Sequence, residues 1–179
     1  MIVLRKNKIC FLILLLVVSS SCNSQKDKSA SPTNSTTPTS QSPKNSIEVV
    51  KVRALPVAIK PNETAEALVE VTVQSGYHIN ANPATFNYLI ATDLQLPTTS
   101  EVSVNFIVYP TALTKSFPFA EKPLAVYEGT TNIKVQLKAA KTAKPGTQNL
   151  LGKLRVQACD DQVCYAPGTL ELSIPLSIK

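Results

Sequence analysis

The sequence lacks most of the features that mark common classes of enzyme and of nucleic-acid-binding protein. Along its 179 residues there is one histidine, and no serine–histidine–aspartate set, carboxylate pair or glycine-rich phosphate loop can be picked out. It also has no basic stripe with interleaved aromatic residues, the pattern that nucleic-acid binding favours. Hydrolase, nucleotide-binding and nucleic-acid-binding functions therefore have no support in the sequence.

Residues that could bind a metal are equally scarce. A closed structural zinc site uses four ligands, whereas the expected folded part offers only His78, Cys159 and Cys164, which come from distant segments. We therefore expect no metal and no other cofactor. We expect His78 to shape the loop that leads to Pro83.

The apolar segment near the N-terminus is too short to cross a bilayer. Basic residues at positions 5, 6 and 8 precede an apolar run over residues 9–18, and small residues follow up to Cys22. This is the layout of a cleaved export signal, whereas a membrane-spanning helix needs about 20 apolar residues. Residues 18–22 resemble a lipobox. The sequence thus predicts a lipoprotein signal peptide over residues 1–21 and lipidation of Cys22, with an ordinary secretory signal as the alternative.

Residues 23–46 consist almost entirely of Ser, Thr, Pro, Asn, Gln and Lys. Such a composition cannot bury enough apolar surface to offset the entropy lost on ordering. We expect residues 22–46 to form a lipidated N-terminus and a disordered tether, with the lipid as the only contact with the membrane. The protein would then face the periplasm in a bacterial cell envelope, and both the outer and the inner membrane fit this expectation.

The formal charge of +6 lies mostly outside the expected folded part. From residue 47 onward, twelve basic residues are balanced by eleven acidic ones. A nearly neutral domain agrees with the absence of a nucleic-acid partner.

Residues 47–179 are long enough for one domain with its own core. Apolar residues, mostly valine, occupy every second position of residues 50–54 and 67–73, which is the period of half-buried strands. Similar runs recur at residues 102–109, 131–138, 148–158 and 169–178, and turn-forming residues separate them. No convincing amphipathic helix is present. The spacing predicts an all-β fold, an antiparallel β-sandwich of about seven to nine strands, with a β-barrel as the alternative.

Cys159 and Cys164 are the cysteines left for the folded domain, because Cys10 leaves with the signal peptide and Cys22 carries the lipid. A pair in an oxidising compartment is expected to be disulfide-bonded at least part of the time. The bridge would close a small loop, and so it would stabilise the domain less than a bridge between distant strands. This favours thiol–disulfide exchange. The two aspartates directly after Cys159 disfavour a thiolate there, so a static bridge stays open as the alternative.

Three ordered motifs, at residues 76–83, 119–129 and 156–167, resemble the N-terminal periplasmic domain of the DsbD thiol:disulfide interchange proteins. The resemblance covers nearly all of residues 47–179. It implies an immunoglobulin-like antiparallel β-sandwich with Cys159 and Cys164 as its catalytic pair. It also implies an electron carrier of the protein-disulfide reductase type. Such a carrier is re-reduced by a membrane-bound thiol reductase and passes electrons to oxidised periplasmic proteins, such as disulfide isomerases or cytochrome c maturation factors.

In that family an aromatic residue on a cap loop covers the cysteines and moves aside when a partner docks. By motif position Phe119 is the first candidate for this residue and Phe117 the second, with ordinary core packing as the alternative for both. Tyr165 is a further candidate for shielding. The resemblance slightly favours Cys164 as the attacking cysteine and Cys159 as the resolving one.

The sequence departs from the best-known family members in two ways. They place five residues between the cysteines rather than four, and they continue into a transmembrane reductase and a thioredoxin-like domain. We therefore expect the electrons to come from a separate protein. The alternative function is an immunoglobulin-like interaction or assembly lipoprotein with a static structural disulfide.

Overall fold

The computed structural model describes residues 45–179. The predicted signal peptide, the lipidation of Cys22 and the tether up to residue 44 lie outside the described residues. A short 3-10 helix, η1 (Ser46–Glu48), begins the described chain, and every other regular element in it is a β-strand. No helix in residues 45–179 is long and apolar enough to cross a membrane.

The strands of the described chain form three sheets of four. The first has the order β1 (Val50–Ala54), β3 (Thr64–Val73), β9 (Thr130–Ala139) and β6 (Val102–Val108). The second has the order β2 (Val57–Ile59), β12 (Gly168–Ile178), β10 (Gly146–Val156) and β5 (Asp93–Gln95). The third has the order β11 (Ala158–Cys159), β4 (His78–Asn80), β8 (Leu124–Tyr127) and β7 (Leu113–Lys115). Neighbouring strands are antiparallel, except that β2 runs parallel to β12.

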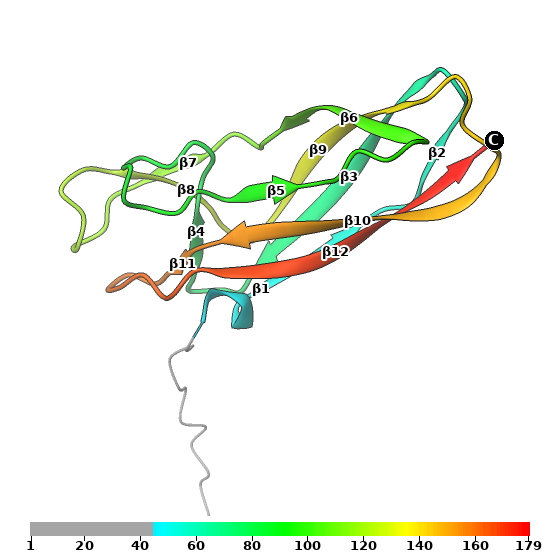
Figure 1. Ribbon diagram of the computed structural model, residues 1–179. Helices are drawn as coiled ribbons and strands as arrows, with labels where there is room; N and C mark the ends of the chain where they lie inside the picture. The colour runs from blue at the N-terminus through cyan, green and yellow to red at the C-terminus, as the bar shows by residue number, and fades with distance from the viewer. Residues whose placement is uncertain (1–44) are drawn as a thin grey trace, which may run out of the picture. The chain divides into compact units, whose positions relative to one another are not determined.

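The two larger sheets pack face to face, and the small third sheet lies at one end of the sandwich (Figure 1). Their inner faces supply the core, because every second residue of the long strands points inward. In β3 and β9 the buried residues are Ala67, Val69, Val71, Val73, Ile133, Val135, Leu137 and Ala139. In β10 and β12 they include Leu150, Leu154, Val156, Ile174, Leu176 and Ile178. The predicted antiparallel sandwich is confirmed, and the barrel alternative is not.

One predicted strand is divided in the structure. The apolar run over residues 148–158 was expected to be continuous, but β10 ends at Val156 and β11 starts at Ala158 in a different sheet. The side chain of Gln157 satisfies groups at this break: its Oε1 accepts hydrogen bonds from the Ile90 amide at 2.9 Å and from Asn80 Nδ2 at 3.1 Å. Because the chain changes sheets here, Cys159 is carried out of the main sandwich and into the third sheet.

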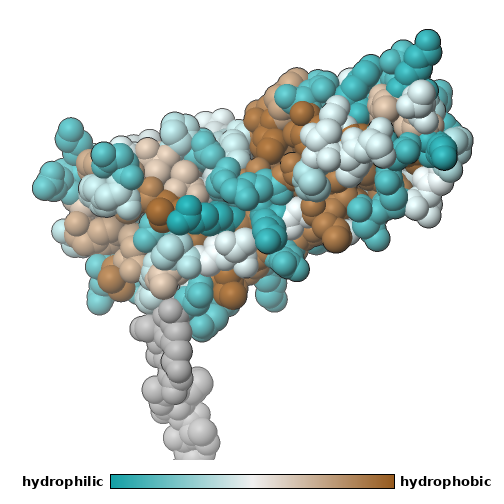
Figure 2. Space-filling view, in the orientation of Figure 1, coloured by the Kyte–Doolittle hydropathy of each residue, from teal (hydrophilic) through white to brown (hydrophobic). Residues whose placement is uncertain are grey.

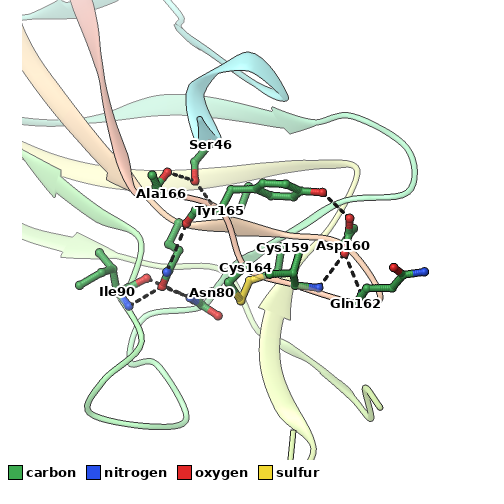
Figure 3. The surroundings of a disulfide bond; sticks show 12 residues. Ser46, Asn80, Ile90, Cys159, Asp160, Gln162, Cys164, Tyr165 and Ala166 are labelled. Carbon is green, nitrogen blue, oxygen red and sulfur yellow. Dashed lines mark hydrogen bonds between the residues drawn. A yellow bond between two sulfur atoms is a disulfide. The ribbon is translucent and has the colours of Figure 1, made fainter. Parts of the chain in front are cut away.

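The start of the described chain is joined to this same end of the domain. The buried Ser46 hydroxyl accepts a hydrogen bond from the Ala158 amide at 2.8 Å and donates one to the Ala166 carbonyl at 2.7 Å. The Ser46 amide donates a further bond to Ala166, at 3.1 Å. Helix η1 is thereby held against the backbone on both sides of the cysteine pair, at Ala158 in β11 and at Ala166 before β12 (Figure 3).

Candidate redox site

Cys159 and Cys164 are joined by a disulfide, with an S–S distance of 2.03 Å and a Cα–Cα distance of 3.9 Å. The two residues face each other directly as an antiparallel bridge. Hydrogen bonds flank the pair on both sides, from the Tyr165 amide to the Ala158 carbonyl at 2.8 Å and from the Asp160 amide to the Val163 carbonyl at 3.0 Å. The cysteines therefore occupy a non-hydrogen-bonded position of a tight hairpin, where opposed side chains come closest.

Asp160 holds the turn of this hairpin together. Its Oδ1 accepts hydrogen bonds from the amides of Gln162 at 2.7 Å and Val163 at 2.8 Å, and its Oδ2 accepts one from the Tyr165 hydroxyl (Figure 3). Burial acts to raise the pKa of Asp160, but the hydrogen bonds from Tyr165, Gln162 and Val163 more than offset it and leave the pKa below its ordinary value. The negative charge next to Cys159 in the sequence therefore stabilises the turn, because it accepts hydrogen bonds from the turn amides. All three hydrogen bonds of the carboxylate lie within the hairpin, between Asp160 and residues 162, 163 and 165.

The two cysteines differ in exposure. Cys159 is completely buried, whereas Cys164 is partly exposed. Cys164 lines a cavity of about 320 Å³ together with Tyr88, Phe119 and Val163, whose exposed fractions are 69%, 38% and 51%. A partner that docks at this end of the domain meets Cys164 first, within a rim of exposed apolar side chains.

This rim lies at the end of the molecule formed by the third sheet and its loops. In Figure 2, hydrophobic side chains appear among hydrophilic ones at that end. A larger cavity of about 720 Å³ lies over β5, β10 and β12, but none of its lining residues is a cysteine or histidine. The groups capable of exchange chemistry are therefore concentrated at the third sheet.

A stack of aromatic rings packs on the same face of the third sheet as the disulfide. Phe117 is buried and stacks on His78, with 4.1 Å between ring centroids, and Phe119 stacks on Phe117 at 5.5 Å. Phe117 also forms a small apolar cluster with Leu124 and Val126, separate from the main core. The loop between β7 and β8 is therefore anchored over the third sheet by Phe117, while Phe119 reaches the cavity that contains Cys164.

The three residues predicted to shield the cysteines lie at different places relative to the disulfide. Phe119 shares the cavity wall with Cys164, and Phe117 lies deeper, against His78. Tyr165 pairs with Ala158 on the opposite face of the hairpin, and its hydroxyl bonds to Asp160 (Figure 3). Its position supports a part in bracing the turn more than in covering the sulfur atoms.

His78 is the site residue that the sequence did not identify. The sequence predicted a loop, but His78 begins strand β4, is 1% exposed and is the register partner of Cys159. A three-residue strand is too short to show a periodic pattern, and the ring that covers His78 comes from a segment 39 positions later. The only available signal was the place of His78 inside the first of the three family motifs.

Removing the Asp160 carboxylate should loosen the hairpin. We expect Asp160→Ala to lower the free energy of unfolding of the oxidised protein by about 1 to 2 kcal/mol, the scale of hydrogen bonds to a charged group. The turn would also hold the cysteines together less well, raising the reduction potential by about 20 mV. Urea denaturation and equilibration with glutathione measure these two effects, and Asp161→Ala, at the exposed neighbouring position, is the matched control.

The pH dependence of this difference follows from the lowered pKa of Asp160. The unfolded carboxyl has a pKa of about 3.9, so the stabilisation is fully present above about pH 4. It is lost as the pH falls through the folded-state pKa. A stability difference between wild type and Asp160→Ala that stays unchanged down to about pH 2 would contradict this assignment.

Comparison with known proteins gives the chain a family and supports its fold. The family model of the N-terminal domain of thiol:disulfide interchange protein DsbD matches residues 47–175. Among solved structures, the N-terminal periplasmic domain of ScsB from Proteus mirabilis superposes with a TM-score of 0.50 at 16% sequence identity, over 73% of this chain and 47% of that one. The chain thus spans less than half of the ScsB domain, and at this identity the match shows the fold alone.

Two further solved structures show weaker likeness. One is a cohesin–dockerin complex from Clostridium thermocellum, with a TM-score of 0.39 and 10% identity over 73% of this chain and 99% of that one. The other is the major pilin subunit BcpA of Bacillus cereus, with a TM-score of 0.41 and 5% identity over 73% of this chain and 40% of that one. No curated protein sequence matches the chain.

The domain is an immunoglobulin-like β-sandwich that carries a hairpin disulfide beside a stack of aromatic rings. The family model covers most of the chain, and the protein belongs to the DsbD N-terminal domain family.

Proposed function

We propose that the protein is an electron carrier of the protein-disulfide reductase type, and that Cys159 and Cys164 are its reacting pair. The observation that carries this proposal is the unequal exposure of the two sulfur-bearing residues: Cys164 lines an open cavity, and Cys159 is buried directly behind it. An attacking thiol needs access to a partner, whereas a resolving thiol needs only to reach the attacker.

The chemical cycle balances two electrons and two protons. The Cys164 thiolate attacks a partner's disulfide, and the attacked bond breaks to release one partner thiolate while a mixed disulfide forms. The Cys159 thiolate then attacks the Cys164 sulfur, which closes the intramolecular bridge and releases the second partner sulfur as a thiolate. A thiol donor reverses these steps and restores the dithiol.

The partners follow from this cycle and from the family. The donor is a separate membrane-bound thiol reductase, and the acceptors are oxidised periplasmic proteins of the disulfide isomerase or cytochrome c maturation type. The exposed side chains of Tyr88, Phe119 and Val163 supply an apolar surface on which such partners can dock. Lipidation of Cys22 would keep the carrier in the cell envelope, with no other contact with the membrane.

The competing function is that of an interaction or assembly lipoprotein with a static structural disulfide. The geometry of the hairpin disfavours it. The disulfide joins residues five positions apart within one hairpin and does not tie the two large sheets together. The turn already has hydrogen bonds of its own at Asp160. A bridge so placed contributes little to the stability of the sandwich.

The reduction potential separates the two functions. We expect a potential of about −120 to −270 mV, the range of exchange-active pairs, whereas structural bridges lie below about −300 mV. Equilibration of the purified domain with glutathione or dithiothreitol buffers, followed by thiol alkylation, gives the value. A potential below about −300 mV, together with no mixed disulfide in cells carrying either single Cys→Ser variant, would rule out the carrier function.

A further inference from the structure

His78 is a buried polar residue, and one of its two ring nitrogens is left without a hydrogen-bond partner among the described residues. It is 1% exposed, and its Nε2 atom has no hydrogen-bond partner within the described residues. An unsatisfied buried polar atom costs about 1 to 3 kcal/mol and is rare in folded proteins. Such an atom at a reacting centre calls for a functional explanation.

The sheet register brings His78 to the buried cysteine. Cys159 in β11 is the direct antiparallel partner of His78 in β4. Side chains of directly opposed residues point to the same face of a sheet, with Cβ atoms about 4.5 to 5.5 Å apart. Phe117 stacks on the imidazole at 4.1 Å and fixes the orientation of the ring.

The exchange cycle requires a proton acceptor at this place. The thiolate is the nucleophile, so Cys159 must lose its proton before it can attack Cys164. A fully buried thiol ionises with difficulty because the charged form is poorly solvated. Asp160 is a poor acceptor for this proton, because its carboxylate is already engaged in three hydrogen bonds of the turn and its pKa is lowered.

We propose that His78 accepts the proton of the Cys159 thiol when this cysteine resolves the mixed disulfide. The proposal rests on the proposed function. The S–H bond of Cys159 breaks and an N–H bond forms on the imidazole. The resulting thiolate attacks Cys164, the Cys159–Cys164 bond forms, and the bond to the partner sulfur breaks. The partner leaves as a thiolate and takes a proton from water, while the imidazolium releases its proton to water.

The surroundings of His78 suit both halves of this transfer. Burial lowers its pKa, while Glu128, Asp161 and Asp160 act to raise it and Lys115 to lower it. The lowered pKa leaves the imidazole neutral and able to accept a proton near neutral pH. His78 also lines a polar cavity of about 480 Å³ with Lys115, Glu128 and Asp161, which offers the proton a route to solvent.

The test compares wild type with His78→Phe, which keeps an aromatic ring for the Phe117 stack but has no basic nitrogen. The reduced protein is mixed with oxidised glutathione across about pH 5.5 to 9, and acid-quenched samples are resolved by mass. We expect formation of the glutathione mixed disulfide at Cys164 to be unchanged. We expect its resolution by Cys159 to slow by about 100-fold near pH 7, the scale of general base catalysis, and the difference to shrink toward pH 9 as hydroxide replaces the base.

A second variant, His78→Gln, removes the base with a polar side chain, so that a folding defect in one variant does not decide the outcome. Equal resolution rates in wild type and both variants at every pH would overturn the proposal and leave the carrier function intact. Failure of wild type to form any mixed disulfide would overturn both. A slowing that is the same at every pH would also overturn it, because it would show that His78 acts only through packing.

Discussion

A Cys159→Ser variant should accumulate a covalent complex with its redox partners, whereas a Cys164→Ser variant should form none. In the first variant the exposed Cys164 still attacks a partner's disulfide, but no second thiol is present to release it. In the second the remaining thiol of the pair is Cys159, which is completely buried. We expect both variants to lose turnover by at least about 1,000-fold, because a covalent step cannot be completed without its nucleophile or its resolving group.

Non-reducing electrophoresis after acid trapping measures how much covalent complex each variant forms. Mass spectrometry identifies the captured protein. Cys22→Ser is the control for Cys22, the third cysteine expected in the mature chain. With purified protein, this substitution should leave the yield of covalent complexes unchanged. Complexes of equal yield through Cys159 and through Cys164 would contradict the assignment of attacker and resolver.

Removing the rings of the aromatic stack should open the site to small reductants in a graded order. Each aromatic pair contributes about 0.5 to 1.5 kcal/mol. Phe119 takes part in one ring contact and Phe117 in two. If the stack holds the loop over the cysteines, Phe119→Ala should raise the rate of disulfide reduction by up to about 10-fold and Phe117→Ala by up to about 100-fold, since each 1.4 kcal/mol shifts the open population tenfold.

The rate at which dithiothreitol reduces the disulfide, monitored by thiol labelling, ranks the variants. Phe106→Ala is the matched control, because Phe106 is also an exposed phenylalanine, at 52%, but lies in β6 of the first sheet. Rates that are the same in all three variants and in wild type would show that Phe117 and Phe119 are ordinary packing residues.

The strands of the first two sheets could be predicted from the sequence, because most of them are long enough to show apolar residues at every second position. The ten residues of β3 bury every second side chain from Ala67 to Val73, and this pattern survives without knowledge of the partner strands. The third sheet could not be predicted, since β4 and β7 have three residues each and β11 has two. Such strands are defined by hydrogen bonds to distant segments, which a local pattern does not contain.

The disulfide was predictable from the sequence, whereas its surroundings were not. The spacing of Cys159 and Cys164 and the surrounding motifs indicated exchange. The use of the Asp160 charge depends on a turn whose hydrogen bonds appear only when the chain is folded. The juxtaposition of His78 with Cys159 depends on a pairing across 81 positions of sequence.

The hydrogen bonds of Ser46 make the point where the domain joins the preceding chain part of the same structural unit as the disulfide. Ser46 is bonded to Ala158, which directly precedes Cys159, and to Ala166, two positions after Cys164. A force or displacement that enters the domain through residue 45 is therefore delivered first to the two backbone segments that carry the sulfur atoms. The first described residues and the disulfide thus share one end of the domain, and the backbone at Ser46 is coupled by hydrogen bonds to both sides of the cysteine pair.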